Sequence, residues 1–384
     1  MSSPRVQTAL SLSLALALTH CGAPTEPLDG SVVPDSALAS PDGTPPPDAA
    51  TTADAEALDA ITDDALEPAM DAVAPPDATA PMQDAARDAT SDTQTDAGPS
   101  GPMVDRRMPQ LFSLSFRPSE ADPMARVADG TQLVHLDTRV APLGRLVVYL
   151  HGAGRPSTCG SNEHGRVLAS YGFHVIAPCY ISDYGVGVCG NDIAGCRLEA
   201  FDGTDRHPAI TIARADSIEE RVVRALQLLV RRNPQGDWGY FLDAGRPRWG
   251  SIVISGISHG ASSSGVISQV RGVERAVMLS GPLDTNQAWL MRAGMTPVAR
   301  LWSFSHTADS QHMGHLASIA TLGLAGPPTN VETTAAPYAN SHRLISSLMT
   351  TDGHGSTQAG GVSPRDAMGN YRFDRAWRTM YGAR

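Results

Sequence analysis

The chain has 384 residues and a formal net charge of −11 at pH 7, but this charge is unevenly distributed. Residues 22–105 hold eighteen acidic residues and one basic residue, Arg87, giving −17; Arg5 adds +1 and the remaining residues carry +5. The acidic segment is rich in Ala, Pro, Asp and Thr and has no aromatic residue, so it lacks the apolar surface needed to offset its ordering entropy. The rest is only mildly basic, with short pairs such as Arg231-Arg232, which argues against a nucleic-acid partner.

Residues 1–21 have the pattern of an export signal. Arg5 precedes a largely apolar run of ten residues, 9–18, which is too short to span a bilayer. Cys21 follows shortly after, and Leu18-Thr19-His20-Cys21 resembles the processing site of a bacterial lipoprotein signal, although His20 replaces a small residue. The resemblance implies that Cys21 bears a lipid and anchors an exported envelope protein to the membrane. Secretion without a lipid is the alternative.

The chain is expected to divide into this signal, a disordered acidic linker over 22–109 and a folded domain over 110–384. The linker has no helical or strand periodicity of apolar residues, and its acidic composition predicts a flexible tether whose charges repel one another. Strands are predicted in the domain at 111–116, 131–138, 145–151, 173–180, 251–258, 275–282, 300–307 and 342–348. The central ones are continuous apolar runs, which is typical of strands covered on both faces by helices.

Helices are predicted between these strands. Residues 216–232 place apolar side chains at helical spacing, with Asp216 as the expected N-cap and arginines in the last turn. Weaker helical patterns cover 162–171, 259–270, 310–322 and 364–380. Alternation of strands and helices indicates a mainly parallel sheet in a three-layer α/β domain.

The segment 251–268, SIVISGISHGASSSGVIS, contains seven serines where a buried strand leads into a helix of small residues. Only Ser258 has glycine at both −2 and +2, in the pattern G-x-S-x-G. Such glycines let a nucleophilic serine occupy a sharp strand-to-helix turn without Cβ clashes. The amide of His259, at the start of the helix, can then face a developing oxyanion. A second oxyanion amide is expected from Ala153 or Gly154, in the HGAG that ends an earlier strand.

A serine nucleophile needs a base and an acid that orients the base. His354 lies in a loop rich in Gly, Ser and Thr after the last strand, where an imidazole could reach back across the sheet edge. Asp309, after the penultimate strand, is the favoured acid, and Asp284, one strand earlier, is the alternative. Either choice gives the chain order Ser, Asp, His.

These motifs together resemble an α/β-hydrolase over about residues 130–384. HGAG (151–154), GISHG (256–260), SHTAD (305–309) and GHGST (353–357) follow the order of that superfamily. MLSGPLDT and ANSHRLISSL are similar to a little-characterised group of exported bacterial α/β-hydrolases. The resemblance implies a three-layer α/β-hydrolase fold, nucleophile Ser258, base His354, acid Asp309 and oxyanion amides near Ala153 and His259. It implies a serine esterase, without a cofactor, acting on a small or polymeric ester.

Four cysteines besides Cys21 are crowded into 38 residues: Cys159, Cys179, Cys189 and Cys196. In an exported protein this even number favours two disulfides. Three connectivities are open, among them Cys189 with Cys196, which closes a short loop and leaves Cys159 with Cys179. A zinc site is the competing interpretation, but no C-x-x-C pair is present. Residues 181–215, which include two of these cysteines, are expected to overhang the carboxyl end of the sheet and to shape a pocket.

Two other functions are compatible with parts of the sequence. A catalytically inactive surface binding protein could keep GISHG as a structural turn, because a fold does not fix a function. A metal site at His306, His312 and His315 would use two histidines at i and i+3, but no H-E-x-x-H motif accompanies them; the latter two histidines otherwise suit solvated or capping roles at a helix start. The acyl length of the substrate and the oligomeric state are left open.

Overall fold

A computed structural model describes residues 101–383. The predicted signal, the predicted lipidation site Cys21 and most of the acidic linker lie outside these described residues. Residues 101–109, which the sequence assigned to the end of the linker, contact the domain: the amide of Asp105 donates to the carbonyl of Gln235 at 2.8 Å, and that of Met103 to the carboxylate of Asp237 at 2.7 Å. The packed part of the chain therefore already includes residues before 110.

A nine-stranded sheet forms the centre of the domain, in the order β1-β2-β4-β3-β7-β8-β9-β11-β10. From β4 to β10 all neighbours are parallel, whereas β2 is antiparallel to both β1 and β4. The strands are β1 (Leu111–Phe116), β2 (Gln132–Asp137), β3 (Leu146–Leu150), β4 (His174–Ala177), β7 (Ile252–Ile257), β8 (Arg275–Leu279), β9 (Leu301–His306), β10 (Thr329–Asn330) and β11 (Arg343–Ser346). All eight predicted strands are present.

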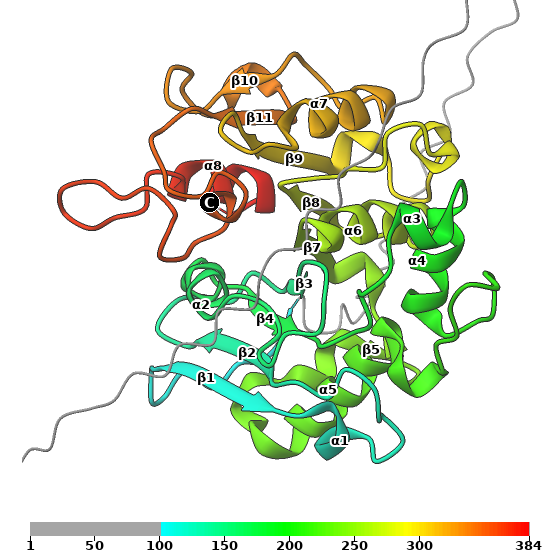
Figure 1. Cartoon of the computed structure of the whole chain (residues 1–384). Helices are drawn as coiled ribbons and strands as arrows, with labels where there is room; N and C mark the ends of the chain where they lie inside the picture. Colours follow the sequence, from blue (N-terminus) through cyan, green and yellow to red (C-terminus); the bar gives the residue numbers. More distant parts are fainter. Residues whose placement is uncertain (1–100, 384) are drawn as a thin grey trace, which may run out of the picture. The chain divides into compact units, whose positions relative to one another are not determined.

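Helices cover both faces of this sheet (Figure 1). One face packs against α5, α6 and α7, and the other against α2 and α8. The helices are α1 (Pro118–Ala121), α2 (Asn162–Ser170), α3 (Val186–Cys189), α4 (Ile193–Asp202), α5 (Ile218–Arg232), α6 (His259–Val270), α7 (His312–Thr321) and α8 (Asp374–Tyr381); a small hairpin pairs β5 (Leu242–Asp243) with β6 (Arg246–Pro247).

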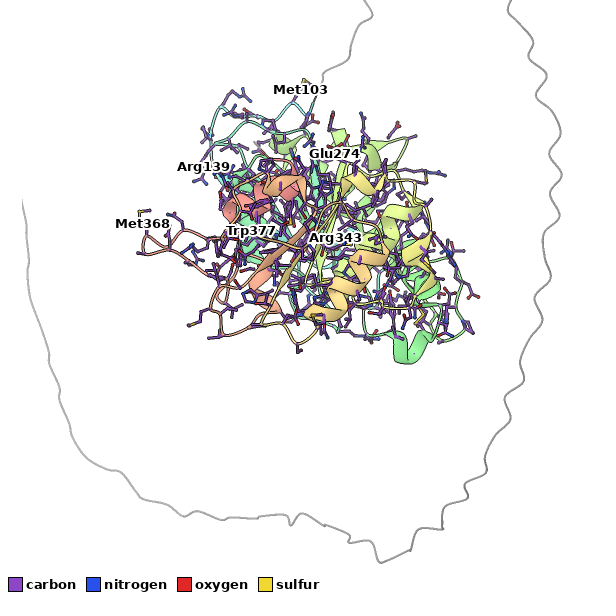
Figure 2. The ribbon with its side chains drawn as sticks, turned by 90° about the horizontal axis from the view of Figure 1, so that it is seen from above. Met103, Arg139, Glu274, Arg343, Met368 and Trp377 are labelled. Atoms are coloured by element: carbon purple, nitrogen blue, oxygen red, sulfur yellow. A yellow bond between two sulfur atoms is a disulfide. The ribbon has the colours of Figure 1, made fainter. Side chains whose placement is uncertain are left out.

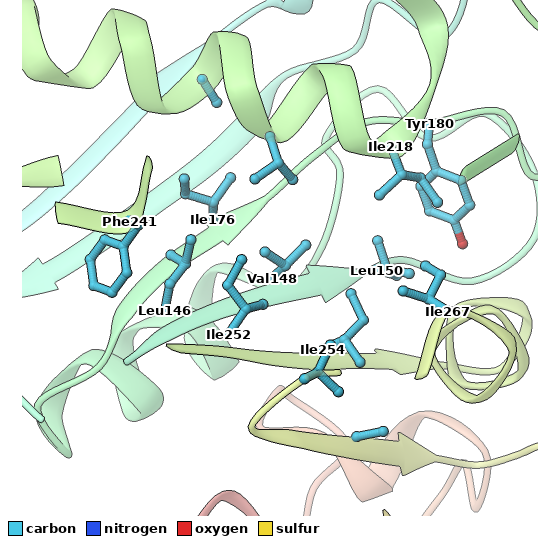
Figure 3. Packing of buried hydrophobic residues seen from close by; sticks show 14 of the residues in the cluster. Leu146, Val148, Leu150, Ile176, Tyr180, Ile218, Phe241, Ile252, Ile254 and Ile267 are labelled. Carbon is cyan, nitrogen blue, oxygen red and sulfur yellow. The ribbon is translucent and has the colours of Figure 1, made fainter. Parts of the chain in front are cut away.

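The continuous apolar runs of β3 and β7 are explained by this three-layer arrangement. Side chains of a strand alternate between the two faces, so both faces must be apolar where helices cover both. Figure 3 shows Leu146, Val148 and Leu150 of β3 with Ile252 and Ile254 of β7 in one cluster. The intervening residues of both strands belong to the cluster on the opposite face.

Two helix boundaries differ from the sequence predictions. Ser217, not Asp216, caps α5, because its hydroxyl accepts the amide of Glu220; Asp216 instead accepts two loop amides and pairs with Arg221 at 2.7 Å. The helix predicted from 364 begins only at Asp374. The preceding residues form a loop that projects from the body, with Met368 at its outer end and Trp377 inside (Figure 2).

The structure pairs Cys159 with Cys179 and Cys189 with Cys196. The second disulfide joins α3 to α4, two short helices that the sequence patterns did not predict. Within residues 101–383 there is no helix both long and apolar enough to cross a membrane. The strand order, the helices on both faces and the strand-to-helix turn after β7 confirm the three-layer α/β-hydrolase fold.

Candidate active site

Ser258 occupies the turn between β7 and α6 with φ +58° and ψ −120°. This backbone conformation is unfavourable for a residue with a side chain and is retained only where its surroundings enforce it. The flanking glycines allow it. A Cβ on Gly256 would lie 2.6 Å from the carbonyl oxygen of Leu150, and one on Gly260 would lie 2.3 Å from the same atom. The two glycines therefore let the turn sit against the end of β3.

Asp309 and His354 form a direct acid–base pair. Nδ1 of His354 lies 2.8 Å from Oδ2 of Asp309. The Asp309 side chain is 2 % exposed and follows β9, whereas His354, one-third exposed, precedes the 3-10 turn Gly355–Thr357. The two loops touch at Gly353, where a Cβ would lie 2.5 Å from the amide nitrogen of Asp309. The pairing thus depends on a glycine directly before the histidine.

The segment after β8 connects this pair to the serine. The amide of Ser258 donates to the carbonyl of Leu279 at 2.9 Å. The next residue, Ser280, donates its hydroxyl to the carbonyl of His354 at 2.7 Å. Among the described residues no hydrogen bond joins the Ser258 hydroxyl to the imidazole. Such bonds are often long in unliganded hydrolases and form in the substrate complex.

Backbone amides of two segments lie near Ser258. The amide of His259 begins α6 and, as a first-turn amide, has no partner within the helix. Gly152 packs directly against the serine, because a Cβ there would lie 3.5 Å from Cβ of Ser258. The next amide, that of Ala153, has no acceptor among the described residues, whereas the amide of Gly154 donates to the carbonyl of Ser182 at 3.1 Å. The amides of Ala153 and His259 thus have no acceptor among the described residues, whereas that of Gly154 is already bonded.

Asp284, the alternative acid, lies in a different buried ion pair. Both its oxygens bond Arg197 of α4, at 2.9 and 3.1 Å, and it also accepts the indole N–H of Trp289. Arg197 donates further to the carbonyl of His259 at 3.2 Å. The structure thus places Asp284 beneath the start of α6, and Asp309 alone of the two acids bonds His354.

Of the three histidines considered as metal ligands, two share one hydroxyl. Ser305 Oγ lies 2.8 Å from Nδ1 of His312 and 3.0 Å from Nδ1 of His315, and both side chains are buried, so the solvated role expected from their position is wrong. His306 instead bonds the carbonyl of Leu348. Nδ1 of His315 lies 3.8 Å from Asp309, and burial lowers the pKa of His315 to about 4, so that its imidazole is neutral at pH 7.

The side chain of His259 is part of a buried cluster and not of the candidate triad. Its Nδ1 lies 3.3 Å from the hydroxyl of Tyr180, and Tyr184 packs edge-on against the ring. Burial, with Arg197 nearby, lowers the pKa of His259 well below its usual range. The ring is therefore uncharged, and only the backbone amide of His259 is a candidate for binding an oxyanion.

Sequence reasoning missed Ser280, Gly353 and Arg197. Ser280 stands in the quoted motif MLSGPLDT, and Gly353 is adjacent to His354, so both were visible as neighbours of candidate residues. Arg197 carried no signal, because nothing in its local sequence indicated that it would be buried against Asp284. The expectation that 181–215 overhang the site is met in part: Tyr184 and Arg197 reach the start of α6.

Solved structures of hydrolases are similar to this chain. An S-formylglutathione hydrolase from Agrobacterium tumefaciens is 13% identical, with a TM-score of 0.31 over 53% of this chain and 77% of that one. Esterase 2 from Thermogutta terrifontis is 14% identical, with a TM-score of 0.34 over 70% and 89% of the two chains. Another structure of that esterase, phosphorylated by paraoxon, has the same identity and TM-score over 71% and 91%.

No protein-family profile matches the chain, and no curated protein sequence matches it. At the identities and TM-scores above, the assignment of the fold rests on the strand order and on the turn at Ser258. The chain has the α/β-hydrolase fold. Its activity is argued from the site.

Proposed function

We propose that the protein is a serine hydrolase that cleaves carboxylic esters through an acyl-enzyme. The observation that carries this proposal is the bond between His354 Nδ1 and the buried Asp309, linked through the segment after β8 to a serine on a sharp strand-to-helix turn. With Nδ1–H donating to the carboxylate, Nε2 carries the lone pair that a general base requires. A serine hydroxyl becomes an effective nucleophile only with such a base.

The proposed reaction assigns one role to each of these groups. Ser258 Oγ attacks the ester carbonyl carbon while Nε2 of His354 takes the hydroxyl proton. The carbonyl oxygen becomes an oxyanion, to which the amides of Ala153 and His259 donate. Collapse of this intermediate breaks the carbon–oxygen bond, and the imidazolium gives its proton to the departing alcohol. Water then hydrolyses the acyl-enzyme by the same steps, and Asp309 stabilises the imidazolium throughout.

Hydrolysis of p-nitrophenyl acetate by Ser258→Ala tests this function. Turnover should fall by a factor on the order of 10⁶ if the three residues act as a unit. Ser251→Ala is the matched control, because Ser251 precedes the same strand and its described hydrogen bond is made by the backbone. It should retain the wild-type rate. Near wild-type hydrolysis by Ser258→Ala would rule out the proposed nucleophile.

We propose further that the protein is exported and lipid-anchored through Cys21, with the acidic segment as a tether. The two disulfides support an oxidising compartment. In cells, a Cys21→Ser variant should move from the membrane fraction to the soluble envelope fraction, and the mass of the wild-type N-terminal peptide should include acyl chains. A wild-type protein found in the soluble fraction with an unmodified Cys21 would contradict the anchor and favour secretion.

A further inference from the structure

A cavity of about 180 Å³ adjoins the candidate nucleophile. Ile257, the residue directly before Ser258, lines it on one side, and Ala153 of the oxyanion loop lines it on another. Gln358, four residues after His354, the turn around Thr158 and Tyr149, His151 and Gly152 at the end of β3 also line it. The cavity is open to solvent on part of its surface and is bordered by the segments that carry the nucleophile, one oxyanion amide and the base.

The position of the cavity indicates whether it receives the acyl group or the alcohol group of an ester. A carbonyl whose oxygen accepts from the amide of Ala153 has its two substituents on different sides of the reacting carbon. The leaving group must lie next to His354, because this residue returns the proton to it. Neither Ser258 nor His354 lines the cavity itself; its lining on the side of the reacting carbonyl comes from Ile257, which precedes the nucleophile, and from Gly152 and Ala153 of the oxyanion loop. The acyl group therefore enters the cavity, and the alcohol group lies toward solvent at the histidine loop.

The wall of the cavity at residues 156–160 is held in place from several sides. The disulfide between Cys159 and Cys179 ties it to the residues after β4. Two backbone bonds of 2.8 Å attach it to Thr131, and a Cβ on Gly160 would lie 2.6 Å from Cβ of Ala177. A wall attached in this way cannot retreat easily to admit a longer chain.

Two further lining residues, Tyr149 and Gln358, are joined by a side-chain hydrogen bond. The hydroxyl of Tyr149 donates to Oε1 of Gln358 at 2.5 Å, and the Tyr149 side chain is buried in the central strand β3. Breaking this bond to extend the cavity would leave the hydroxyl without its partner, which costs free energy in a buried position.

The volume sets the size of the acyl group. A protein cavity of about 150 Å³ accommodates one molecule of benzene, which has six carbons. We propose that this cavity is the acyl-binding site and that it limits the enzyme to esters of short acyl groups, up to about six carbons. The proposal rests on the proposed esterase function and adds the substrate class to it.

The test is a series of p-nitrophenyl esters from acetate to decanoate. For the wild type, kcat/KM should fall by about tenfold or more between butanoate and octanoate, because a chain that does not fit forfeits its binding energy in the transition state. Gln358→Ala should enlarge the cavity and raise the octanoate-to-butanoate ratio about fivefold or more. Gln110→Ala is the control, because Gln110 is exposed before β1 and its described hydrogen bonds are made by its backbone. This variant should keep the wild-type octanoate-to-butanoate ratio.

A second variant narrows the cavity instead of enlarging it. This variant keeps the test valid if Gln358→Ala does not fold. Thr158 is exposed at the cavity wall, so Thr158→Phe should narrow the cavity and lower the butanoate-to-acetate ratio about fivefold or more. Equal kcat/KM for octanoate and butanoate in a wild-type protein whose Ser258 reacts with a fluorophosphonate would overturn the acyl site and leave the esterase function standing. Absence of both hydrolysis and labelling would overturn both proposals.

Discussion

At the scale of single residues, the structure separates two buried aspartates that sequence spacing left as alternatives. Asp309 accepts from the imidazole of His354, whereas Asp284 neutralises Arg197 beneath α6. A carboxylate that already binds a guanidinium through both oxygens has little capacity left to orient a histidine. Loss of Asp309 should therefore affect catalysis, and loss of Asp284 should affect the stability of the fold.

Asp309→Asn should lower kcat by a factor of about 10⁴ with little effect on the folded structure, because an amide can donate to Nδ1 and favour the wrong imidazole tautomer. Asp284→Asn is the matched comparison. It leaves the buried Arg197 without its counter-charge and should lower the free energy of unfolding by about 3–5 kcal/mol. Steady-state kinetics and urea unfolding of both variants measure these effects. A larger loss of kcat in folded Asp284→Asn than in Asp309→Asn would reverse the assignment.

At the scale of elements, two disulfides stabilise different parts of the domain. The Cys159–Cys179 bridge spans 20 residues and attaches the turn beside the cavity to the residues after β4. The Cys189–Cys196 bridge spans 7 residues and joins α3 to α4, from which Arg197 reaches the start of α6. A cross-link that closes a longer loop removes more entropy from the unfolded chain.

Replacement of each cysteine pair by serines tests this difference. Loss of the Cys159–Cys179 bridge should lower the free energy of unfolding by about 3 kcal/mol, and loss of the Cys189–Cys196 bridge by about 2 kcal/mol. Guanidinium unfolding of the two double variants under oxidising conditions measures both values, with the intact protein as reference. A greater loss from the shorter bridge would show that native contacts of α3 and α4, and not chain entropy, dominate.

At the scale of the whole molecule, five buried histidines besides His259 remain neutral in the folded state at pH 7. Burial lowers their pKa from the usual 6.5 to about 3 for His164 and to about 4 for His135, His151, His174 and His315. The unfolded chain takes up these protons below pH 6.5, whereas the folded chain does so only near pH 3–4. The stabilisation by neutral histidines is thus fully present above pH 6.5 and is lost progressively as the pH falls toward 4.

The free energy of unfolding should therefore decrease between pH 6.5 and pH 4.5, and each additional proton bound by the unfolded chain contributes a slope of about 1.4 kcal/mol per pH unit. Urea unfolding at half-unit pH intervals from 7.5 to 4.5 provides the slope. A free energy of unfolding that stays constant from pH 7 to pH 5 would contradict the neutral, buried state of these histidines.

The fold could largely be predicted from the sequence. The strands β3 and β7 are continuous apolar runs, and such runs are explained by a sheet that helices cover on both faces. The strand-to-helix turn at Ser258 could also be predicted, because Ser258 is the only one of the seven serines in 251–268 with glycine at both −2 and +2. Contacts between distant residues could not be predicted. Ser217 caps α5 because the carboxylate of Asp216 pairs with Arg221. Helices α3 and α4 are stabilised by a disulfide and a buried ion pair more than by a periodic apolar face.

The most direct test of the proposed chemistry is labelling of the intact protein by a fluorophosphonate, with the modified peptide identified by mass spectrometry. The wild type should acquire one phosphonyl group on Ser258, and none on the six other serines of 251–268. His354→Ala should abolish the labelling, because the base that activates the hydroxyl is then missing. Absence of labelling in the folded wild type, or labelling of Ser258 that persists in His354→Ala, would contradict a Ser258–His354–Asp309 hydrolase.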